Sequence, residues 1–227
     1  MAKLKKSGIE KFFEKYEKVE FKKNSTVIEA GRETNEVFCV IDGYVKLYMV
    51  SKDGEDLVLN IYKPGAYFPI TWILGDLPIR YDFIAVTDVT AYRAPKEDVL
   101  TYLEENQVEL FDLTKRLSKG VVGLSAQIEY LLFGSACNKV ASVLLVLSKR
   151  FGKEEKNRNI EVEISLTHND IANMAGLTRE TVSIELKKME RRGIIGWRKK
   201  HLLVKNLELL QKESLIGNDD IRSRVVG

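Results

Sequence analysis

The sequence contains few of the residues on which several classes of protein depend. Among 227 residues it has 2 cysteines, 2 histidines and 4 prolines. The two cysteines, Cys39 and Cys137, cannot form a metal cluster on their own and are typical of a protein from a reducing compartment. We therefore expect no metal site and no cofactor.

Long apolar segments are also absent. No apolar run approaches the roughly 18 residues that suggest a membrane-spanning helix, so we expect no membrane partner. The first residues, "MAKLKKSGIEKFFEKYEKVEF", lack the apolar core and the small-residue cleavage site of a secretory signal. Together these absences predict a cytoplasmic protein.

Charge is nearly balanced over the chain but is concentrated in one stretch. The formal net charge is +3. Between Gly176 and Lys205, nine Lys or Arg and three Glu give a local charge of +6, so the rest of the chain totals −3. With 227 residues, the chain is long enough for two domains with separate cores, and this basic stretch falls in the second.

The first third of the chain is rich in β-structure signals. Glycines recur at intervals of 12, 11 and 11 residues, at Gly31, Gly43, Gly54 and Gly65, and separate "EVFCVID", "YVKLYMV" and "DLVLNIY". Short β-branched and aromatic runs at this spacing predict a sandwich or roll. Asp53-Gly54 predicts a hairpin. We expect the roll to end near Pro95, which would be the first residue of a short helix.

From about Gln107 to Phe133 the pattern changes to a long helix. Its apolar residues are spaced 4, 4, 3, 4 and 3 apart, at Leu113, Leu117, Val121, Leu124, Ile128 and Leu131. Such a narrow row is close to a coiled-coil seam, and we interpret it as a dimer contact. Packing against the helix's own domain is the alternative. Gly120 and Gly123 each cost about 1 kcal/mol within a helix, which close approach of a second helix or a flexible point would explain.

The remaining chain predicts a second domain and completes an α+β fold. "FGSACNK", at 133–139, is typical of a hinge; a buried helix, "VASVLLVLSKRF", and an alternating strand, "NIEVEISL", follow it. We predict four parts: a β-roll sensor domain at 1–105, the long dimerisation helix and hinge at 106–136, a winged helix-turn-helix at 137–217, and a C-terminal tail at 218–227.

The helix-turn-helix prediction rests on residue order. Counting from His168 as position one, Ala172 is the small residue at five, Gly176 the turn glycine at nine and Val182 the buried β-branched residue at fifteen. Thr167 and Thr178 are natural N-caps for the two helices. A solvated basic helix would explain the charges but not this order.

The outward side of the second helix supplies candidates for DNA contacts. Arg can bond guanine O6 and N7, and Glu can accept from cytosine N4. The predicted base-reading residues are Arg179, Glu180, Ser183 and Ile184. The predicted phosphate contacts, which fix register without reading sequence, are Thr167, Thr178, Lys187, Lys188, Arg191, Arg198, Lys199 and Lys200.

Residues 20 to 206 resemble the CRP/FNR family of bacterial transcription regulators. The resemblance rests on the glycine-punctuated roll, the long helix and "GLTRETVS". It implies a homodimer with a double-stranded jelly-roll of the cyclic-nucleotide-binding type, an operator of two-fold symmetric double-stranded DNA, and RNA polymerase as a partner. In the family, an Arg-Glu pair at the positions of Arg179 and Glu180 contacts bases. Family members often carry a second base-reading Arg four residues after the Glu, and this chain has Ile184 at that position. We therefore expect its operator to differ from the usual operator of the family.

The sensing segment departs from the cyclic-nucleotide members of the family. Pro69, Ile70 and Thr71 stand where those members carry Gly-Glu-Leu, and Arg80 falls within one residue of their phosphate-binding Arg. A buried phosphate without its donors is poorly held, so we do not expect cyclic AMP. The candidate effector pocket is instead aromatic: Tyr67, Phe68, Ile70, Trp72, Arg80, Tyr81 and Phe83. Core packing is the alternative for the rings, and pairing with Asp76 or Asp82 is the alternative for Arg80.

Two classes of function follow. The first is a transcription regulator that senses an effector other than a cyclic nucleotide, or none. The second is a small-molecule binding module, or a cyclic-nucleotide receptor with a degenerate cassette. Both histidines, His168 and His201, lie in the predicted DNA-binding region, which argues against the haem ligand of the family's carbon-monoxide sensors. No nucleophile–base constellation indicates an enzyme.

Overall fold

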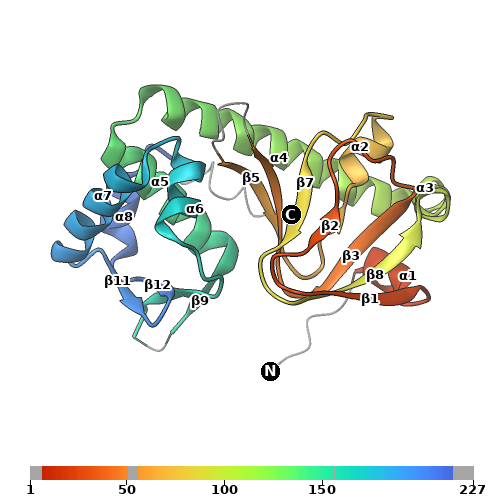
Figure 1. The fold of residues 1–227 in the computed structure, drawn as a ribbon, viewed down its shortest axis with the longest axis horizontal. Helices are drawn as coiled ribbons and strands as arrows, with labels where there is room; N and C mark the ends of the chain where they lie inside the picture. The colour runs from red at the N-terminus through yellow and green to blue at the C-terminus, as the bar shows by residue number, and fades with distance from the viewer. Residues whose placement is uncertain (1–6, 51–55, 156, 217–227) are drawn as a thin grey trace. The chain divides into compact units, whose positions relative to one another are not determined.

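The computed structural model describes residues 7–50, 56–155 and 157–216 (Figure 1). The chain divides into two compact units, the first extending to Leu117 and the second beginning at Ser118. The long helix predicted from the sequence is present with the predicted bounds, as α4 (Gln107–Phe133), and the boundary between the units falls within it. No helix in the described ranges is long and apolar enough to cross a membrane.

The first unit is a roll of two antiparallel sheets. Its strands are β1 (Glu17–Phe21), β2 (Thr26–Ile28), β3 (Glu36–Asp42), β4 (Val45–Val50), β5 (Asp56–Tyr62), β6 (Tyr67–Phe68), β7 (Asp82–Ala85) and β8 (Val89–Pro95). One sheet has the order β1-β8-β3-β6 and the other β2-β7-β4-β5. The helices of this unit are α1 (Gly8–Phe13), α2 (Ile70–Leu74), α3 (Lys96–Glu105) and the start of α4. The predicted β-roll is therefore confirmed.

Glycine turns connect the strands as the sequence predicts. Gly31, Gly43 and Gly65 all have positive φ values, between 80° and 86°. A Cβ added at Gly43 would lie 2.2 Å from the backbone oxygen of Asp88, so no larger residue fits there. The predicted hairpin at Asp53-Gly54 lies outside the described residues.

Alternation along β3 divides the interior of the roll into two cores. Phe38 and Val40 join a cluster that draws on strands of both sheets and so fills the space between them. Val37 and Cys39 point the other way, into a cluster completed by α1, α3 and the start of α4. Successive residues of a strand face opposite sides, so one strand supplies both cores.

Pro95 differs from its predicted place by one position. It still belongs to β8, where it pairs with Glu36 of β3, and it occupies the N-cap of α3. The helix itself begins at Lys96. The pairing with β3 holds Pro95 in an extended conformation, with ψ of 141°, which delays the helix by one residue.

Within the described residues, the second unit combines the remainder of α4 with four further helices and a small sheet. Its elements are α5 (Ala136–Phe151), β9 (Gly152–Glu154), β10 (Ile160–Val162), α6 (His168–Ala175), α7 (Arg179–Arg191), β11 (Ile195–Arg198), β12 (His201–Val204) and α8 (Leu207–Glu213). The sheet has the order β11-β12-β10-β9. This is the predicted winged helix-turn-helix, with α6 and α7 as its two helices and β11–β12 as its wing.

The segment predicted as a hinge separates two helices. Helix α4 ends at Phe133, and α5 begins at Ala136 with Ser135 as its N-cap. The Ser135 hydroxyl accepts from the Asn138 backbone, while the Asn138 side chain accepts from the Ser135 backbone. This capping box starts a new helix after Gly134 and explains why the apolar pattern breaks there.

The residues of the predicted seam of α4 lie in two different environments. Leu117, Val121, Leu124 and Ile128 are exposed, and Leu131 is half-buried. Leu113 differs, because it is only 3% exposed and packs with Phe13 and Leu103 in the core of the first unit. It therefore belongs to the roll and not to the exposed row. A Cβ added at Gly120 would meet nothing within 4 Å, so packing within the described chain does not require a glycine there.

Candidate nucleic-acid interface

Threonine hydroxyls cap the N-termini of both helices of the helix-turn-helix, α6 and α7. Thr167 Oγ1 accepts from the backbone N of Asp170 at 3.1 Å, and Asp170 Oδ2 accepts from the backbone N of Thr167 at 2.8 Å. Gly176 then closes α6 in the left-handed region, with φ of 60°. Thr178 Oγ1 accepts from the Thr181 backbone at 3.2 Å and begins α7. The N-cap assignments made from the sequence are confirmed, and the turn that orients α7 is set locally.

Helix α7 has one buried side and one exposed side. Val182, Leu186 and Met189 are almost fully buried and form the predicted core stripe. Arg179 and Glu180 are exposed at the first turn. Ile184 is also exposed, at 53%, although it is apolar. These three side chains contribute little to the core and are available to a partner.

Ser183, a predicted base reader, is bonded within the protein. Its hydroxyl donates to the backbone oxygen of Arg179 at 2.8 Å and lies 2.8 Å from Nδ1 of His168. A hydroxyl has one hydrogen, so Nδ1 of His168 must be the donor in the second bond. The His168 ring also lies 5.8 Å from the Trp197 ring of β11. His168 thus links the start of α6 to α7, a role that sequence reasoning missed.

The basic side chains of α7 and of the wing fall into two groups. In the first group each cation has a carboxylate partner: Lys188 bonds Glu185 at 2.8 Å, Arg192 bonds Glu213 at 2.5 Å, and Arg198 bonds Glu155 and Glu161. In the second group are exposed cations without an ion pair to any described residue: Arg179, Lys187, Arg191, Lys199 and Lys200. The charges of the second group are therefore not neutralised by a carboxylate of the described chain.

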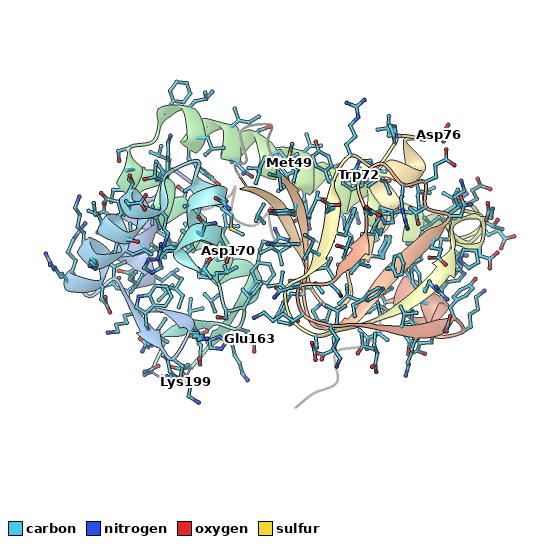
Figure 2. The ribbon with its side chains drawn as sticks, in the orientation of Figure 1. Met49, Trp72, Asp76, Glu163, Asp170 and Lys199 are labelled. Carbon is cyan, nitrogen blue, oxygen red and sulfur yellow. The ribbon has the colours of Figure 1, made fainter. Side chains whose placement is uncertain are left out.

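The wing carries part of this second group at its tip. Lys199 lies in the turn between β11 and β12 with φ of 56°, and its side chain extends away from the sheet (Figure 2). Lys200 follows it and is also exposed. Arg198, one residue earlier, instead turns back toward the sheet to reach its carboxylates. The predicted phosphate role of Arg198 thus competes with an existing ion pair.

In the roll, the predicted effector pocket is divided between the two cores. Phe68 stacks on Phe83 with ring centroids 4.8 Å apart and lies tilted against Tyr62 at 4.9 Å. Trp72 packs edge-on against Phe83 at 5.7 Å and against Tyr81 at 6.0 Å. These rings belong to the core between the sheets.

Tyr67 and Ile70 face the other core, toward the helices. Tyr67 is the neighbour of Phe68 in β6, so the two side chains point to opposite sides of the strand. The Arg116 guanidinium of α4 lies 5.7 Å from the Tyr67 ring centroid, and Asp112 holds that guanidinium at 2.9 Å. Burial raises the pKa of Tyr67 to about 12. The seven predicted pocket residues therefore do not line one cavity.

Arg80 differs from the other predicted pocket residues because it is exposed. Within the described part of the chain it forms an ion pair with neither Asp76 nor Asp82. The Asp82 carboxylate instead accepts from the backbone N of Ala30 at 2.8 Å. Neither the pocket nor the predicted alternative pairing accounts for Arg80.

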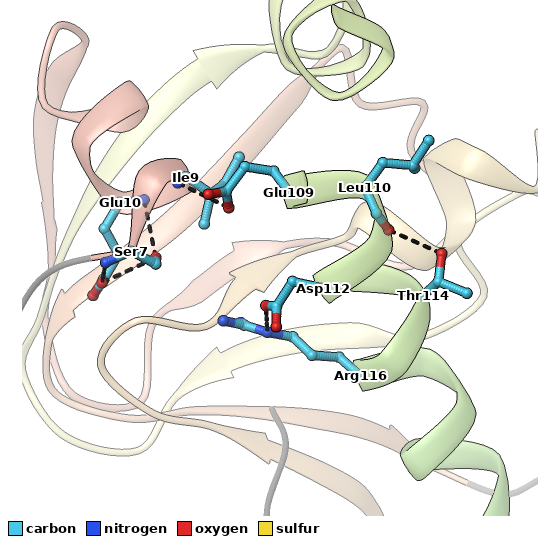
Figure 3. Close-up of polar contacts among 8 residues, drawn as sticks. All are labelled: Ser7, Ile9, Glu10, Glu109, Leu110, Asp112, Thr114 and Arg116. Atoms are coloured by element: carbon cyan, nitrogen blue, oxygen red, sulfur yellow. Dashed lines mark hydrogen bonds and ion pairs between the residues drawn. The ribbon is translucent and has the colours of Figure 1, made fainter. Parts of the chain in front are cut away.

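Polar contacts hold α1 against the start of α4 (Figure 3). Ser7 and Glu10 form a capping box at the start of α1, and Oε2 of Glu109 accepts from the backbone N of Ile9 at 3.2 Å. This contact joins the first turn of α4 to α1, whereas the Asp112–Arg116 pair lies within α4 itself. The segment next to the predicted sensing residues is thus a packed part of the first unit.

Neither cysteine has the surroundings of a reactive thiol. Cys39 is buried in the core of the roll. Cys137 is half-buried and donates to Oε2 of Glu213 at 3.4 Å. Burial, helped by the Glu213 carboxylate, raises the pKa of Cys137 to about 11. Because the thiolate is the reactive form, this thiol is unreactive near neutral pH.

Comparison with known proteins agrees with this geometry. The family model for a Crp-like helix-turn-helix domain matches residues 138–213, and that for a cyclic nucleotide-binding domain matches residues 18–106. The transcriptional regulator SdrP of Thermus thermophilus is 30% identical over 192 residues, which cover 82% of this chain and 90% of SdrP. A CRP-like cAMP-activated global transcriptional regulator of Mycobacterium tuberculosis is 26% identical and covers 92% of each chain.

A solved structure extends the likeness to the fold. A CRP/FNR-family transcriptional regulator from Thermus thermophilus superposes with a TM-score of 0.69 at 26% identity, covering 87% of this chain and 97% of that one. The roll, the long helix and the winged helix-turn-helix together define a DNA-binding transcription regulator. More specifically, the chain belongs to the CRP/FNR family.

Proposed function

We propose that the protein acts as a homodimer whose two α7 helices read the halves of a two-fold symmetric DNA site. The exposure of Arg179, Glu180 and Ile184 on a helix whose other side is buried carries this proposal. Arg179 would bond a guanine, Glu180 would accept from a cytosine, and Ile184 would meet a thymine methyl. Thr178, Lys187 and Arg191 on α7, Thr167 at the start of α6, and Lys199 and Lys200 on the wing would contact phosphates. RNA polymerase would be the partner on which the bound dimer acts.

The experiment that tests this assignment compares two kinds of basic residue. Arg179→Ala should lose discrimination at one base position of each half-site. Lys199→Ala should weaken binding to every sequence alike and flatten the dependence of affinity on salt by about 1.8 in the logarithmic slope, about 0.9 for each wing of the dimer. Equal losses for both variants on operator and unrelated DNA would contradict the division between base-reading and phosphate contacts.

The exposed row of α4 supports the homodimer. Val121, Leu124 and Ile128 are each more than half exposed, which leaves an apolar row along the helix. A second copy of this helix would cover it as in a coiled coil. Replacing Leu117 and Leu124 by Glu should give monomers with about 10²–10⁴-fold weaker operator binding, because the two half-sites are then no longer bound together. Sedimentation velocity measures the first effect; a double variant that remains dimeric would remove the assignment.

For the effector, we propose that the roll does not respond to cyclic nucleotides. Ile70 has no group to accept a ribose hydroxyl, and it is buried in the core beside Tyr67. Pro69 has no N–H to offer a phosphate. An apolar or aromatic ligand, or no ligand at all, agrees better with the rings of this segment.

A cyclic nucleotide remains the second candidate, because the roll matches the cyclic nucleotide-binding domain and one relative is cAMP-activated. A ligand present at 100 times its dissociation constant stabilises the fold by about 2.7 kcal/mol. We expect millimolar cyclic AMP and cyclic GMP to shift neither the melting temperature nor the operator affinity. A shift that Arg80→Ala abolishes would restore the cyclic-nucleotide candidate.

A further inference from the structure

Arg198, the last residue of β11, is held by two carboxylates from another part of the sheet. Its Nη1 donates to Oε1 of Glu155 and, at 3.1 Å, to Oε2 of Glu161, while its Nη2 donates to Oε2 of Glu155 at 3.1 Å. The pairing with Glu155 is bidentate, which is a strong arrangement for an Arg and a carboxylate. The hydrogen bond from Arg198 lowers the pKa of the Glu155 carboxyl, and the same bond raises the pKa of the Arg198 guanidinium.

Backbone hydrogen bonds fix the positions of the two glutamates that carry these carboxylates. Glu161 lies in β10, between Lys153 of β9 and Leu203 of β12. Glu155 follows β9 directly, and its backbone N donates to the Asn159 oxygen at 2.9 Å. A preorganised network of three charges holds better than an isolated surface pair, which contributes at most about 1 kcal/mol.

Arg198 reaches this network across a neighbouring strand. It pairs with His201 of β12 at the end of the wing, and β12 lies between β11 and β10 in the sheet. The guanidinium therefore ties the wing back to β9 and β10. The side chains of Lys199 and Lys200, in the turn that follows, form no ion pair with a described residue and are exposed, although the backbone oxygen of Lys200 accepts from Ser165 Oγ at 3.3 Å.

We propose that Arg198 is a positioning residue of the wing and that Glu155 and Glu161 withhold its charge from the DNA phosphates. Arg198 fixes the strand end from which Lys199 and Lys200 project, and these two lysines make the wing's phosphate contacts. The inference rests on the proposed function, because it requires that the wing meets DNA. Its consequence is a salt dependence that is weaker than the number of cations in the wing alone would give.

The first test releases Arg198. In the double variant Glu155→Gln/Glu161→Gln the guanidinium loses both anionic partners and becomes free to neutralise a phosphate. The slope of log affinity against log salt should steepen by about 1.8, that is about 0.9 for each of the two wings of the dimer, which is about twelvefold more affinity lost between about 50 and 200 mM salt. Glu154→Gln is the matched control, because Glu154 is exposed on β9, precedes Glu155 and has no ion pair to a described residue. Its slope should equal that of the wild type.

The second test removes one charge of each sign. Arg198→Gln/Glu155→Gln leaves the net charge unchanged and should leave the slope unchanged, because both lysines keep their charge, while the affinity should fall by a similar factor at every salt concentration, because the end of β11 has lost its tie. A slope flatter by about 1.8, about 0.9 for each wing of the dimer, would show that Arg198 contacts a phosphate and would overturn the inference. Thermal melting of each variant separates a loss of folding from a change in binding.

The outcomes distinguish this inference from the proposed function. A wild-type protein that prefers no DNA sequence, or a Lys199→Ala variant with an unchanged slope, contradicts the proposed function. If the wild type is selective and Lys199→Ala flattens the slope, but Glu155→Gln/Glu161→Gln behaves like Glu154→Gln, only the inference about Arg198 fails.

Discussion

The outward side of α7 and the segment from Tyr67 to Phe83 use their apolar residues in opposite ways. Ile184 is 53% exposed on α7, whereas Phe83 is fully buried and stacks between other rings of the roll. An exposed apolar side chain contributes little to its own fold, while a buried one contributes several kcal/mol. Substitutions on α7 should therefore change binding at nearly constant stability, and substitutions in the roll segment should change stability.

The largest effect is expected at Phe83. Its ring lies 4.8 Å from Phe68 and 5.7 Å from Tyr62, so Phe83→Ala leaves a cavity between the sheets. The free energy of unfolding should fall by about 3–5 kcal/mol, measured by urea denaturation. A loss below about 1 kcal/mol would indicate that the site already contains space for a ligand, and the two regions would then be alike.

The next effect is expected at Arg179. Arg179→Ala should lose about 1–3 kcal/mol of discrimination at one guanine of each half-site, since a bidentate contact is removed. The melting temperature should stay close to that of the wild type, because Arg179 is exposed. Competition binding with single-base operator variants measures the first quantity. A variant that keeps the wild-type preference at every position would show that Arg179 reads no base.

Ile184 offers a finer test of the same side of the helix. Ile184→Arg replaces a side chain that would meet a thymine methyl by one that can bond guanine O6 and N7. The preferred base at one position of each half-site should change toward guanine, and stability should change by no more than about 0.5 kcal/mol. Unchanged base preference in a binding array would show that Ile184 does not face the groove.

The smallest effect is expected at the cysteines. Because the pKa of Cys137 is raised to about 11, little thiolate is present at pH 7, and iodoacetamide should leave operator binding unchanged. Labelling of Cys137 should increase as the pH rises toward that value, while Cys39 stays protected in the folded core. Rapid labelling of Cys137 at pH 7, detected by mass spectrometry, would contradict the raised pKa that burial and the Glu213 carboxylate produce.

The helix-turn-helix was predictable because its signals are local. The caps at Thr167 and Thr178, the turn at Gly176 and the core stripe of α7 each depend on residues within a few positions. The contact between His168 and Ser183 spans 15 positions, and the pair of Arg198 and Glu155 spans 43. No periodic pattern connects such residues, so the sequence indicated neither contact.

The roll and the long helix show where periodicity is insufficient. Leu113 and Leu124 fall on the same predicted seam, yet one is 3% exposed and the other 56%. The spacing identifies the side of the helix but not the point at which the roll stops covering it. Likewise, the run of aromatic residues from Tyr67 to Phe83 was visible, but strand alternation places Tyr67 and Phe68 in different cores. The assignment of each ring to one core depends on how the strands pair in the two sheets, which the sequence pattern does not give.

The most direct test of the central claim, that the first turns of α7 read DNA sequence, is selection of binding sites from random duplex DNA. We expect enrichment of two related half-sites with centres one helical turn, about 34–36 Å, apart. The same selection with Arg179→Ala should lose the preference at one base of each half-site. Failure of the wild type to enrich any sequence, or enrichment of an identical site by both proteins, would contradict it.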